Sequence, residues 1–574
     1  MALDFYTEII TELKQNTYSE KQWAKCKRDL ALKHGLMTIP TNIDILLRVP
    51  MKHLGELTPK LITKPTRTLS GVSPVAIMTK PFPCPHGKCT MCPGGPESEF
   101  GTVPQSYTGR EPATMRGIRN KYDAYLQVFN RLQQYILLGH NCEKVELILM
   151  GGTFPSFPLD YQEEFVTDAY KAMNDFADMF YINDELDFVK FKDFFELPCD
   201  NIGSPSRTEH LHSKIIELKG SDENETTLET EQLQNETAHI KCVALCIETR
   251  PDYGLREHGN QMLRLGCTRI ELGIQSVYDD VLEKIQRGHT TEQTIKSIQV
   301  LKDVGFKVAG HYMPGLPGVN YEKDLDGMKQ LFTDSGYKPD MIKLYPCMVT
   351  KGTKLYDDYV AGTFVPLDAE RAAKLIAEFK PFIPEYCRVM RVQRDIPTYQ
   401  IEAGVEMTNL RQYIIQKYNP LCRCIRCREP KHKIIDWDST ELKVIEYNAS
   451  HGKEFFISVE DVKNDILIGF CRLRFPSENL RDEITSDSAL VRELHVYGTA
   501  TALGEEGMIQ HKGWGTKLME KAEHIALKHG KIKMVVISGI GAREYYKKKL
   551  NYKKEGPYMV KNIVDNTQIN SVSE

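Results

Sequence analysis

Three cysteines, Cys84, Cys89 and Cys92, are spaced to act together on one loop. They follow a C-x4-C-x2-C pattern directly after a short apolar run that predicts a strand. Three thiolates on one loop can bind three irons of a 4Fe-4S cluster and leave the fourth iron open to a ligand. A structural zinc normally takes four protein ligands, and near this loop only His86 could supply the fourth. The spacing favours an iron–sulfur cluster, with zinc as the alternative.

Glycine and polar residues follow later apolar runs in the same part of the chain. They are Gly151, Gly152, Glu248, Arg250 and Gln275. Glycines without a Cβ allow backbone groups to approach a ligand closely, and polar side chains at successive strand ends would converge on one site. An ion pair between Glu248 and Arg250 that serves only structure is the alternative reading.

The elements that must position these residues are strands alternating with helices. Amphipathic helical stretches such as 292–304 separate six short apolar runs, which predicts parallel βαβ units and a full or partial α/β barrel over about 72–390. Active sites of such barrels lie at the carboxyl ends of the strands. The expected strands are 75–78, 145–150, 243–247, 269–274, 307–311 and 341–345.

A second set of residues suited to chemistry lies near the end of the chain. The segment 510–515 fits [QR]-x-x-G-x-[GA] at a predicted helix start and follows a strand-like run at 490–496. Amides freed by the glycines, together with the helix dipole, would bind a pyrophosphate. A strand at 466–473, a helix at 515–528, a strand at 534–537 and a short helix at 542–549 predict a separate α/β domain over 440–574.

Three more cysteines, Cys422, Cys424 and Cys427, lie in the connector 391–439 between the two α/β regions. Their C-x-C-x2-C spacing predicts a structural zinc site that lacks one ligand. Cys387 and His432 are the candidates for the fourth ligand, and Cys347 is a weaker one.

The overall composition is that of a globular protein with several domains. The chain has 574 residues, a net charge of −4 and a mean hydropathy of −0.39. No run approaches the roughly 20 apolar residues of a membrane span, and the start lacks a signal-like pattern, so a cytoplasmic protein is expected. The tract 221–237, inside an interruption of the barrel at about 180–240, is acidic and poor in bulky apolar residues, which predicts a disordered surface insertion.

Residues 1–71 predict a basic helical region. The first 80 residues contain twelve Lys and Arg against seven Asp and Glu. Such an excess permits a phosphate-rich partner, although a solvated helical cap is the alternative. The candidate RNA-binding residues are Lys25, Lys27, Arg28, Lys64 and Arg67, followed by Arg110, Arg116 and Arg119 just after the cysteine loop.

The cysteine loop, the glycine pair and the polar strand ends together resemble the radical S-adenosylmethionine (SAM) family. The resemblance implies that the open iron binds SAM and that Gly151-Gly152 meets its amino group. The cysteine spacing is one residue longer than the usual C-x3-C-x2-C, and Met91 stands where an aromatic is common. These differences reduce the number of radical SAM subfamilies that the chain could resemble.

The second α/β region resembles the GCN5-related N-acetyltransferase fold, which binds acetyl-CoA. Tyr545 or Tyr546 could donate a proton to a departing CoA thiolate, although packed tyrosines without catalytic duties are commoner. The residues implied in acetyl-CoA binding are Glu493, Leu494, His495, Val496, Gln510, His511, Lys512, Gly513, Trp514, Gly515 and Tyr546.

A radical SAM barrel followed by an acetyltransferase domain resembles the family of Elongator catalytic subunits, which modify tRNA uridine. The resemblance implies that acetyl-CoA supplies a carboxymethyl-type group for carbon 5 of the wobble uridine. Carbon 5 is a poor acyl acceptor, so a SAM-derived radical is expected to act on the acetyl methyl. The family also carries a lysine into its acyl-CoA site, which maps onto Lys144. The matching stretches are 64–72, 92–96, 105–109, 150–154, 247–253, 392–397, 493–498 and 556–561.

The expected partners are tRNA and either other Elongator subunits or a second copy of the chain. The alternative from another class is a protein lysine acetyltransferase that uses the barrel as a scaffold. A tRNA-binding scaffold with degenerate sites is disfavoured, because all three cluster cysteines and the whole CoA-binding turn are present.

Overall fold

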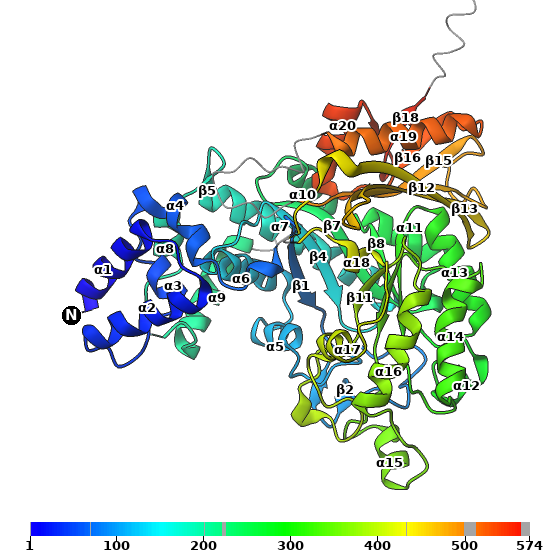
Figure 1. Ribbon diagram of the computed structural model, residues 1–574, viewed down its shortest axis with the longest axis horizontal. Helices are drawn as coiled ribbons and strands as arrows, with labels where there is room; N and C mark the ends of the chain where they lie inside the picture. The colour runs from blue at the N-terminus through cyan, green and yellow to red at the C-terminus, as the bar shows by residue number, and fades with distance from the viewer. Residues whose placement is uncertain are drawn as a thin grey trace, which may run out of the picture.

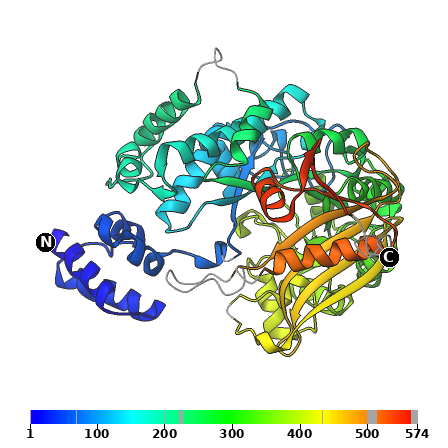
Figure 2. The same cartoon turned by 90° about the horizontal axis from the view of Figure 1, so that it is seen from above.

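The computed structural model describes residues 2–68, 70–199, 201–220, 226–431, 433–498 and 513–563. It consists of a helical N-terminal arm, a parallel half-barrel and an acetyltransferase-like domain (Figure 1). Figure 2 shows the arm extending away from the two larger parts.

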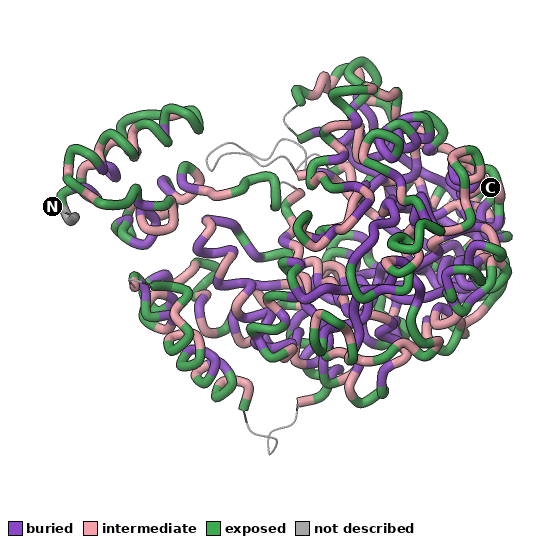
Figure 3. Tube along the Cα trace, turned by 90° about the horizontal axis from the view of Figure 1, so that it is seen from below, coloured by how far each residue is buried: buried purple, intermediate pink, exposed green. Residues whose placement is uncertain are grey.

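The N-terminal arm is helical, as the sequence predicted. Its second helix begins with a capping box at Ser19, and Trp23 and Ala31 are buried on its inner face. Much of the outer surface of the arm is exposed (Figure 3). The arm contains α1 (Ala2–Gln15), α2 (Glu20–Lys33), α3 (Asn42–Leu46) and α4 (Met51–Leu61), followed by the short 3-10 helix η1 (Pro65–Arg67).

The predicted partial barrel is confirmed as a seven-stranded sheet in which every neighbouring pair is parallel. The sheet contains one strand that sequence analysis did not identify, β11. This strand has only four residues, and two of them are arginines, so its sequence lacks the apolar run that marks the other strands. In sheet order the strands are β1 (Ser73–Met78), β4 (Lys144–Met150), β7 (Lys241–Thr249), β8 (Arg269–Gln275), β9 (Lys307–Tyr312), β10 (Met341–Leu344) and β11 (Arg388–Arg391).

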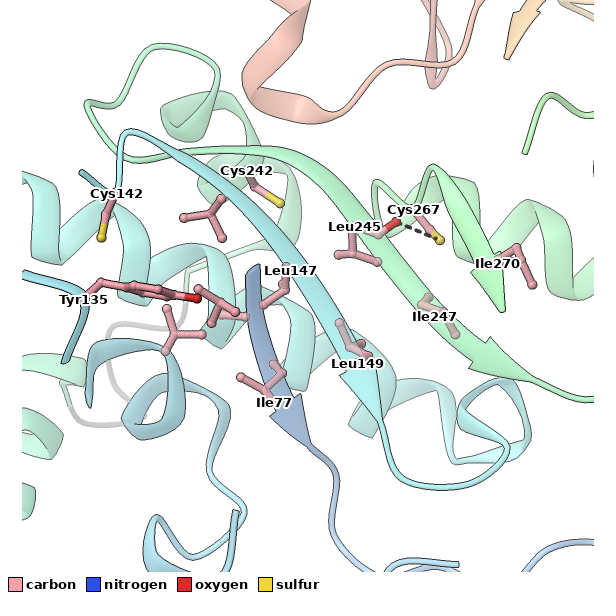
Figure 4. Close-up of a cluster of buried hydrophobic side chains, with 14 of the residues drawn as sticks. Ile77, Tyr135, Cys142, Leu147, Leu149, Cys242, Leu245, Ile247, Cys267 and Ile270 are labelled. Atoms are coloured by element: carbon pink, nitrogen blue, oxygen red, sulfur yellow. Dashed lines mark hydrogen bonds between the residues drawn. The ribbon is translucent and has the colours of Figure 1, made fainter. Parts of the chain in front are cut away.

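Helices cover the outer face of the half-barrel, and their apolar sides pack on the strands. Ile77, Leu147, Leu149 and Ile247 are fully buried in this layer (Figure 4). The helices of the barrel region are α5 (Pro112–Arg119), α6 (Ala124–Leu137), α7 (Leu159–Phe180), α8 (Phe188–Phe194), α9 (Pro205–Lys219), α10 (Leu228–Asn235), α11 (Arg256–Arg264), α12 (Asp279–Lys284), α13 (Thr291–Asp303), α14 (Tyr321–Thr333), α15 (Lys354–Val360) and α16 (Ala369–Phe379). Of these, α15 lies beside the cysteine loop, where the Leu355 amide donates to the Thr90 carbonyl at 3.0 Å. Two small hairpins, β2 (Gly95–Ser98) with β3 (Gly101–Val103) and β5 (Tyr181–Ile182) with β6 (Glu185–Leu186), complete this part.

The C-terminal domain is a second seven-stranded sheet in which only β15 and β16 pair in parallel. Helices α17 (Leu410–Tyr418) and α18 (Ile425–Arg428) connect it to the barrel. Its elements are β12 (Thr440–Ala449), β13 (Gly452–Asp461), β14 (Ile466–Phe475), β15 (Ser488–Val496), α19 (Trp514–Lys528), β16 (Lys533–Val536), the 3-10 helix η9 (Ile540–Ala542), α20 (Arg543–Leu550), β17 (Lys553–Glu555) and β18 (Tyr558–Asn562).

The C-terminal domain docks against the amino-terminal ends of the barrel strands. Asp340, just before β10, forms a bidentate ion pair with Arg492 of β15, with both N–O distances at 2.7 Å. Asp303 at the end of α13 pairs with Arg474 of β14 at 2.6 Å, and Glu454 of β13 pairs with Arg492 at 2.7 Å. All five side chains are fully buried, so the two domains share a polar interface that excludes water.

The prediction of a disordered acidic insertion is wrong for the described part of that tract. Residues 228–235 form α10, which buries Leu228 and Asn235. Asn235 donates to the Asn174 side chain and to the carbonyl of Ile240, and it accepts from the amide of Cys242. Composition misled because the buried side chains here are amides that find hydrogen-bond partners, not bulky apolar groups. Residues 221–225 lie outside the described part.

Within the described ranges, no helix combines the length and apolar character needed to cross a membrane.

Candidate active sites at opposite ends of the barrel

The cysteine loop lies at the carboxyl edge of the half-barrel, directly after β1. Cys89 and Cys92 are buried and Cys84 is half-buried. Burial raises the pKa of the Cys92 thiol to about 11 and also raises that of Cys84. A bound metal would reverse this effect, because a coordinating thiol is deprotonated.

The distances between the three thiol sulfurs distinguish a site for one zinc ion from a site for an iron–sulfur cluster. A single zinc ion binds each sulfur at about 2.3 Å, so its sulfur ligands lie no more than about 4.6 Å apart. Among the described residues, only Cys422, Cys424 and Cys427 form a group whose ligand atoms all lie within 4.8 Å of one another. Cys84, Cys89 and Cys92 are spread more widely than one metal ion allows, which fits a larger cluster.

Buried polar atoms without partners surround the cysteine loop. Within the described chain, His86 Nδ1, Thr90 Oγ1 and His289 Nε2 have no hydrogen-bond partner, and the same is true of Gln105 Oε1, Arg250 Nη1, Gln275 Oε1 and Arg287 Nε. Each such atom costs about 1–3 kcal/mol when it stays unsatisfied. Their concentration at this edge fits a site that is completed by a polar ligand such as SAM.

The glycine pair after β4 has a backbone that other residues would not tolerate. Gly151 and Gly152 have φ angles of +126° and +105°. A Cβ on Gly151 would lie 2.2 Å from Thr79 Oγ1, and one on Gly152 would lie 3.4 Å from the Gln105 Cβ. The two glycines therefore leave their backbone groups unshielded by side chains at the carboxyl edge of the barrel, next to Gln105, whose side-chain oxygen has no hydrogen-bond partner in the described chain.

The polar strand-end residues lie at the same edge, but with partners that the sequence did not predict. Arg250 pairs with Asp252 at 2.8 Å, not with Glu248. Glu248 accepts a hydrogen bond from Tyr107 at 3.0 Å and lies 4.0 Å from Lys343. The structural ion pair considered between Glu248 and Arg250 is absent, which leaves both side chains near the open edge.

Arg287 is a residue of this site that sequence reasoning missed. Its guanidinium donates to Cys89 Sγ at 3.7 Å and to the Gly273 carbonyl at 2.9 Å. Gly288 packs so closely that a Cβ there would lie 2.7 Å from the His86 Cβ. No sequence motif predicts this contact, because Arg287 is 198 positions from Cys89 in the chain.

The second candidate site lies in the C-terminal domain, where the two parallel strands β15 and β16 separate. Pairing between β15 and β16 ends at Val491 and Val536, while β15 continues to Val496 beside β14 alone. The backbone of 492–496 on that side therefore has no strand partner among the described residues, which leaves room for the amides of an extended ligand. Glu493, Leu494, His495 and Val496 all lie in this stretch.

The turn before α19 fits the predicted pyrophosphate site. Gly513 is the N-cap of α19 with φ +69°, and a Cβ on Gly515 would lie 2.6 Å from the Tyr545 hydroxyl. Trp514 Nε1 is buried without a partner in the described chain. Gln510, His511 and Lys512 lie outside the described residues.

The remaining residues predicted for this end differ in their surroundings. Tyr546 is buried in the domain core, whereas Tyr545 is 38% exposed at the glycine turn. Burial lowers the pKa of His495 to about 4, so this imidazole is neutral at pH 7. Although burial opposes its ionisation, Lys307 and Arg472 hold the pKa of Glu493 at about 2. Lys144 is exposed at the start of β4.

The two candidate sites lie at opposite ends of the barrel. The cysteine loop follows the carboxyl ends of the strands, whereas Glu493 reaches Lys307 at the amino end of β9 at 3.4 Å. A seven-residue strand such as β4 is about 20 Å long at roughly 3.3 Å per residue. A group that is bound at one site and used at the other must therefore cross the length of the barrel.

The metal triad in the connector is compact. Cys424 Sγ lies 3.7 Å from Cys427 Sγ, and Cys424 is buried. Cys387 is close enough that its carbonyl accepts from the Ile425 amide at 2.9 Å, but its thiol is not within the compact group. Cys347 is a wrong candidate, because it packs in the apolar cluster that contains Cys89 and Cys92. His432 lies outside the described residues.

Positive charge is concentrated around Arg116 on α5, a helix that packs on β1 through Gly117. Arg116 has its pKa lowered to about 10 by burial and by Arg131, Arg119 and Arg67. None of the four pairs with a carboxylate within 4 Å in the described chain. We call Arg67, Arg116, Arg119 and Arg131 the arginine cluster. Like charges held together without counter-ions are typical of a surface that binds a polyanion.

Arg131 was missed because it lies inside the apolar helix α6, where it stacks on Tyr135 at 4.2 Å. Of the other predicted RNA-binding residues, Lys64 and Arg110 are exposed, and so are Lys25 and Arg28 on α2. Lys27 is half-buried and donates to Asn42 at 2.9 Å, so it is less available to a partner.

Comparison with known families and proteins covers nearly the whole chain. Residues 3–69 match the ELP3 N-terminal domain, 208–330 the radical SAM superfamily, 339–419 the radical SAM C-terminal domain and 418–552 the acetyltransferase (GNAT) family.

Individual relatives match over similar lengths. A Methanocaldococcus infernus protein named tRNA uridine(34) acetyltransferase is 45% identical over 91% of this chain and 92% of its own. Elongator complex protein 3 of Homo sapiens is 39% identical over 94% of this chain and 92% of its own. The solved structure of the M. infernus Elp3 lacking residues 1–46 covers 86% of this chain and 100% of its own, with 39% identity and a TM-score of 0.68.

Proposed function

Because this chain belongs to the Elongator complex protein 3 family, we propose that it modifies uridine 34 of tRNA by adding a carboxymethyl-type group from acetyl-CoA to carbon 5. The observation that carries the proposal is the presence in one chain of a three-cysteine loop at the barrel edge and an acyl-CoA-like strand divergence at its other end.

The chemistry explains why both sites are needed. Carbon 5 of uracil is a poor acyl acceptor, so transfer by an acetyltransferase site alone is implausible. When bound, a 4Fe-4S cluster with SAM supplies radical chemistry that can cut the strong C–H bond of an acetyl methyl group. Cys84, Cys89 and Cys92 would hold the cluster.

The SAM-binding residues would be those around the open carboxyl edge. The backbone of Gly151 and Gly152 would meet the amino group of SAM, and Glu248, Arg250 and Gln275 would contribute polar groups. Arg287 would keep positive charge beside Cys89.

Acetyl-CoA would bind along 493–496 and at the turn 510–515, where the α19 dipole favours phosphate. Tyr545 is placed to donate a proton to the CoA thiolate, because its hydroxyl is at the glycine turn. Lys144 would act from the barrel side: it pairs in register with Lys241, whose Cβ lies beside Gly541 of the acetyltransferase domain.

We propose zinc for Cys422, Cys424 and Cys427, since their spacing suits one tetrahedral ion. Its role would be structural, at the junction between the two domains. Other Elongator subunits or a second copy of the chain remain the proposed protein partners.

The alternative of a protein lysine acetyltransferase is not favoured. Such an enzyme needs neither a cluster loop nor an arginine cluster, and two of the relatives are named for tRNA uridine.

The test is nucleoside mass spectrometry of tRNA after anaerobic incubation with SAM, acetyl-CoA and a reductant. We expect a mass increase on uridine 34 that requires all three components, and metal analysis of the protein should find zinc as well as iron. Modification without SAM, or acetylated lysines with unmodified tRNA, would reject the proposal.

The arginine cluster gives a separate prediction. Replacing Arg67, Arg116 and Arg119 together with glutamine should weaken tRNA binding at least several-fold and flatten its salt dependence by up to about three units, one per lost phosphate contact. Filter binding across a salt series measures both quantities, and acetyl-CoA affinity should not change.

The matched control for this variant removes the same amount of positive charge from the C-terminal domain. It replaces Lys463 after β13, Lys528 at the end of α19 and Lys553 of β17, all exposed, with glutamine. Equal weakening in both variants would show that only overall charge matters.

A further inference from the structure

The acidic tract is attached to the barrel through α10 (Leu228–Asn235). Asn174 of α7 donates to the Glu231 carboxylate at 2.7 Å and to the Glu231 carbonyl at 3.0 Å. Gln232 donates to the Arg264 carbonyl at 2.9 Å. All three polar side chains are buried, so this short helix has a defined position relative to α7 and α11.

The last residue of this helix region crosses to the other domain. Glu236, the C-cap of α10, accepts from Arg543 Nη1 at 2.8 Å. The Glu236 and Arg543 side chains are only 14% and 5% exposed, so water screens this pair less than a surface ion pair. Figure 1 shows α10 beside the acetyltransferase domain that contains α20.

Arg543 is the first residue of α20, the helix that carries Tyr545. The Tyr545 hydroxyl interacts with the Thr516 side chain at the start of α19 and lies 2.6 Å from the position that a Cβ on Gly515 would take. The position of α20 therefore sets how Tyr545 meets the glycine turn.

The segment before α20 packs tightly against β7. It crosses the amino end of β7 so closely that a Cβ on Gly539 would lie 2.1 Å from the Val243 carbonyl oxygen. A Cβ on Gly541 would lie 2.4 Å from the Lys241 Cβ. The barrel thus contacts the start of α20 from two sides, through β7 and through Glu236.

We infer that the acidic tract is a positioning element for the acyl-CoA site: Glu236 holds Arg543, and through α20 it places Tyr545 at the turn that begins α19. Glu236 is a positioning residue that acts through Arg543 and does not touch the ligand. The inference rests on the proposed acyl-CoA site and adds that this site is complete only when α10 is docked on the barrel.

The test compares two glutamine variants on one helix. Glu236→Gln should weaken acetyl-CoA binding about fivefold in calorimetry, with tRNA affinity close to wild type. Glu229→Gln is the matched control, because Glu229 also belongs to α10 but pairs with Arg264 of the barrel while 64% exposed. It should bind acetyl-CoA like the wild type.

A double-mutant cycle separates positioning from general destabilisation. Arg543→Gln should reproduce the loss, and the Glu236→Gln/Arg543→Gln protein should be no weaker than either single variant. Additive losses would overturn the inference.

Failure of the inference and failure of the proposed function give different results. If the wild type binds acetyl-CoA and Glu236→Gln binds it equally well, the positioning role is rejected and the proposed function stands. If the wild type does not bind acetyl-CoA, the proposed function falls, and the inference with it.

Discussion

Cys89→Ser should reduce tRNA modification to background while tRNA binding stays near the wild-type level. Cys89 is buried. Its sulfur lies 3.2 Å from His86 Nε2 and accepts a hydrogen bond from Arg287. A serine hydroxyl is a poor replacement for a thiolate that binds iron. The arginine cluster, which we propose binds tRNA, is not changed by this substitution. Iron content, the visible absorption of the anaerobic protein and modification yield are the quantities to measure.

The control for this substitution is Cys26→Ser, at a half-buried cysteine of α2 outside both candidate sites. This variant should keep full iron content and activity. Normal iron content together with normal activity in Cys89→Ser would remove Cys89 from the cluster and return the loop to a structural role.

Asp340→Asn should destabilise the protein by about 3–5 kcal/mol, because it leaves buried cations without their counter-charge. Asp340 accepts both terminal nitrogens of Arg492 and also the amide of Val308 at 2.9 Å, and it is fully buried. Lys302 and Arg472 lie within 3.8 Å of it. Asparagine keeps the shape but removes the charge, so the docking of the two domains should weaken. A lower urea midpoint measures the effect.

The pH dependence of this effect has a definite sign. Burial opposes ionisation of Asp340, but Arg492 and Lys302 hold its folded pKa well below the ordinary value of 3.8. A lowered carboxyl pKa adds stability above the unfolded pKa, and this stability is lost as the pH falls. The difference between wild type and Asp340→Asn should therefore be constant near neutral pH and shrink below about pH 4.

Asp395→Asn is the control, because Asp395 forms an ion pair with Arg391 while 57% exposed. Exposed pairs contribute about 0–1 kcal/mol, so this variant should unfold close to the wild type. Equal urea midpoints for Asp340→Asn and the wild type would show that the buried network does not hold the domains together.

Features that depend on residues close together in the chain could be predicted before the structure was known. Strand and helix periodicity located six strands of the half-barrel, and the 292–304 pattern matches α13 to within one residue at each end. The cysteine spacing and the glycine turn identified both candidate sites, because a metal loop and a helix N-terminus are built within a few residues of chain. Family resemblance then joined the two sites into one function.

Contacts between residues far apart in the chain could be found only in the folded protein. Arg287 meets Cys89, Arg131 joins the arginine cluster and Asp340 meets Arg492 across positions that no periodic pattern relates. The acidic tract was predicted to be disordered because composition counts apolar residues, whereas α10 is held by buried amides whose partners lie on α7 and β7. The two sites lie at opposite ends of the barrel because the acetyltransferase sheet contacts the amino ends of the barrel strands. Ion pairs between residues far apart in the chain hold the sheet in this position.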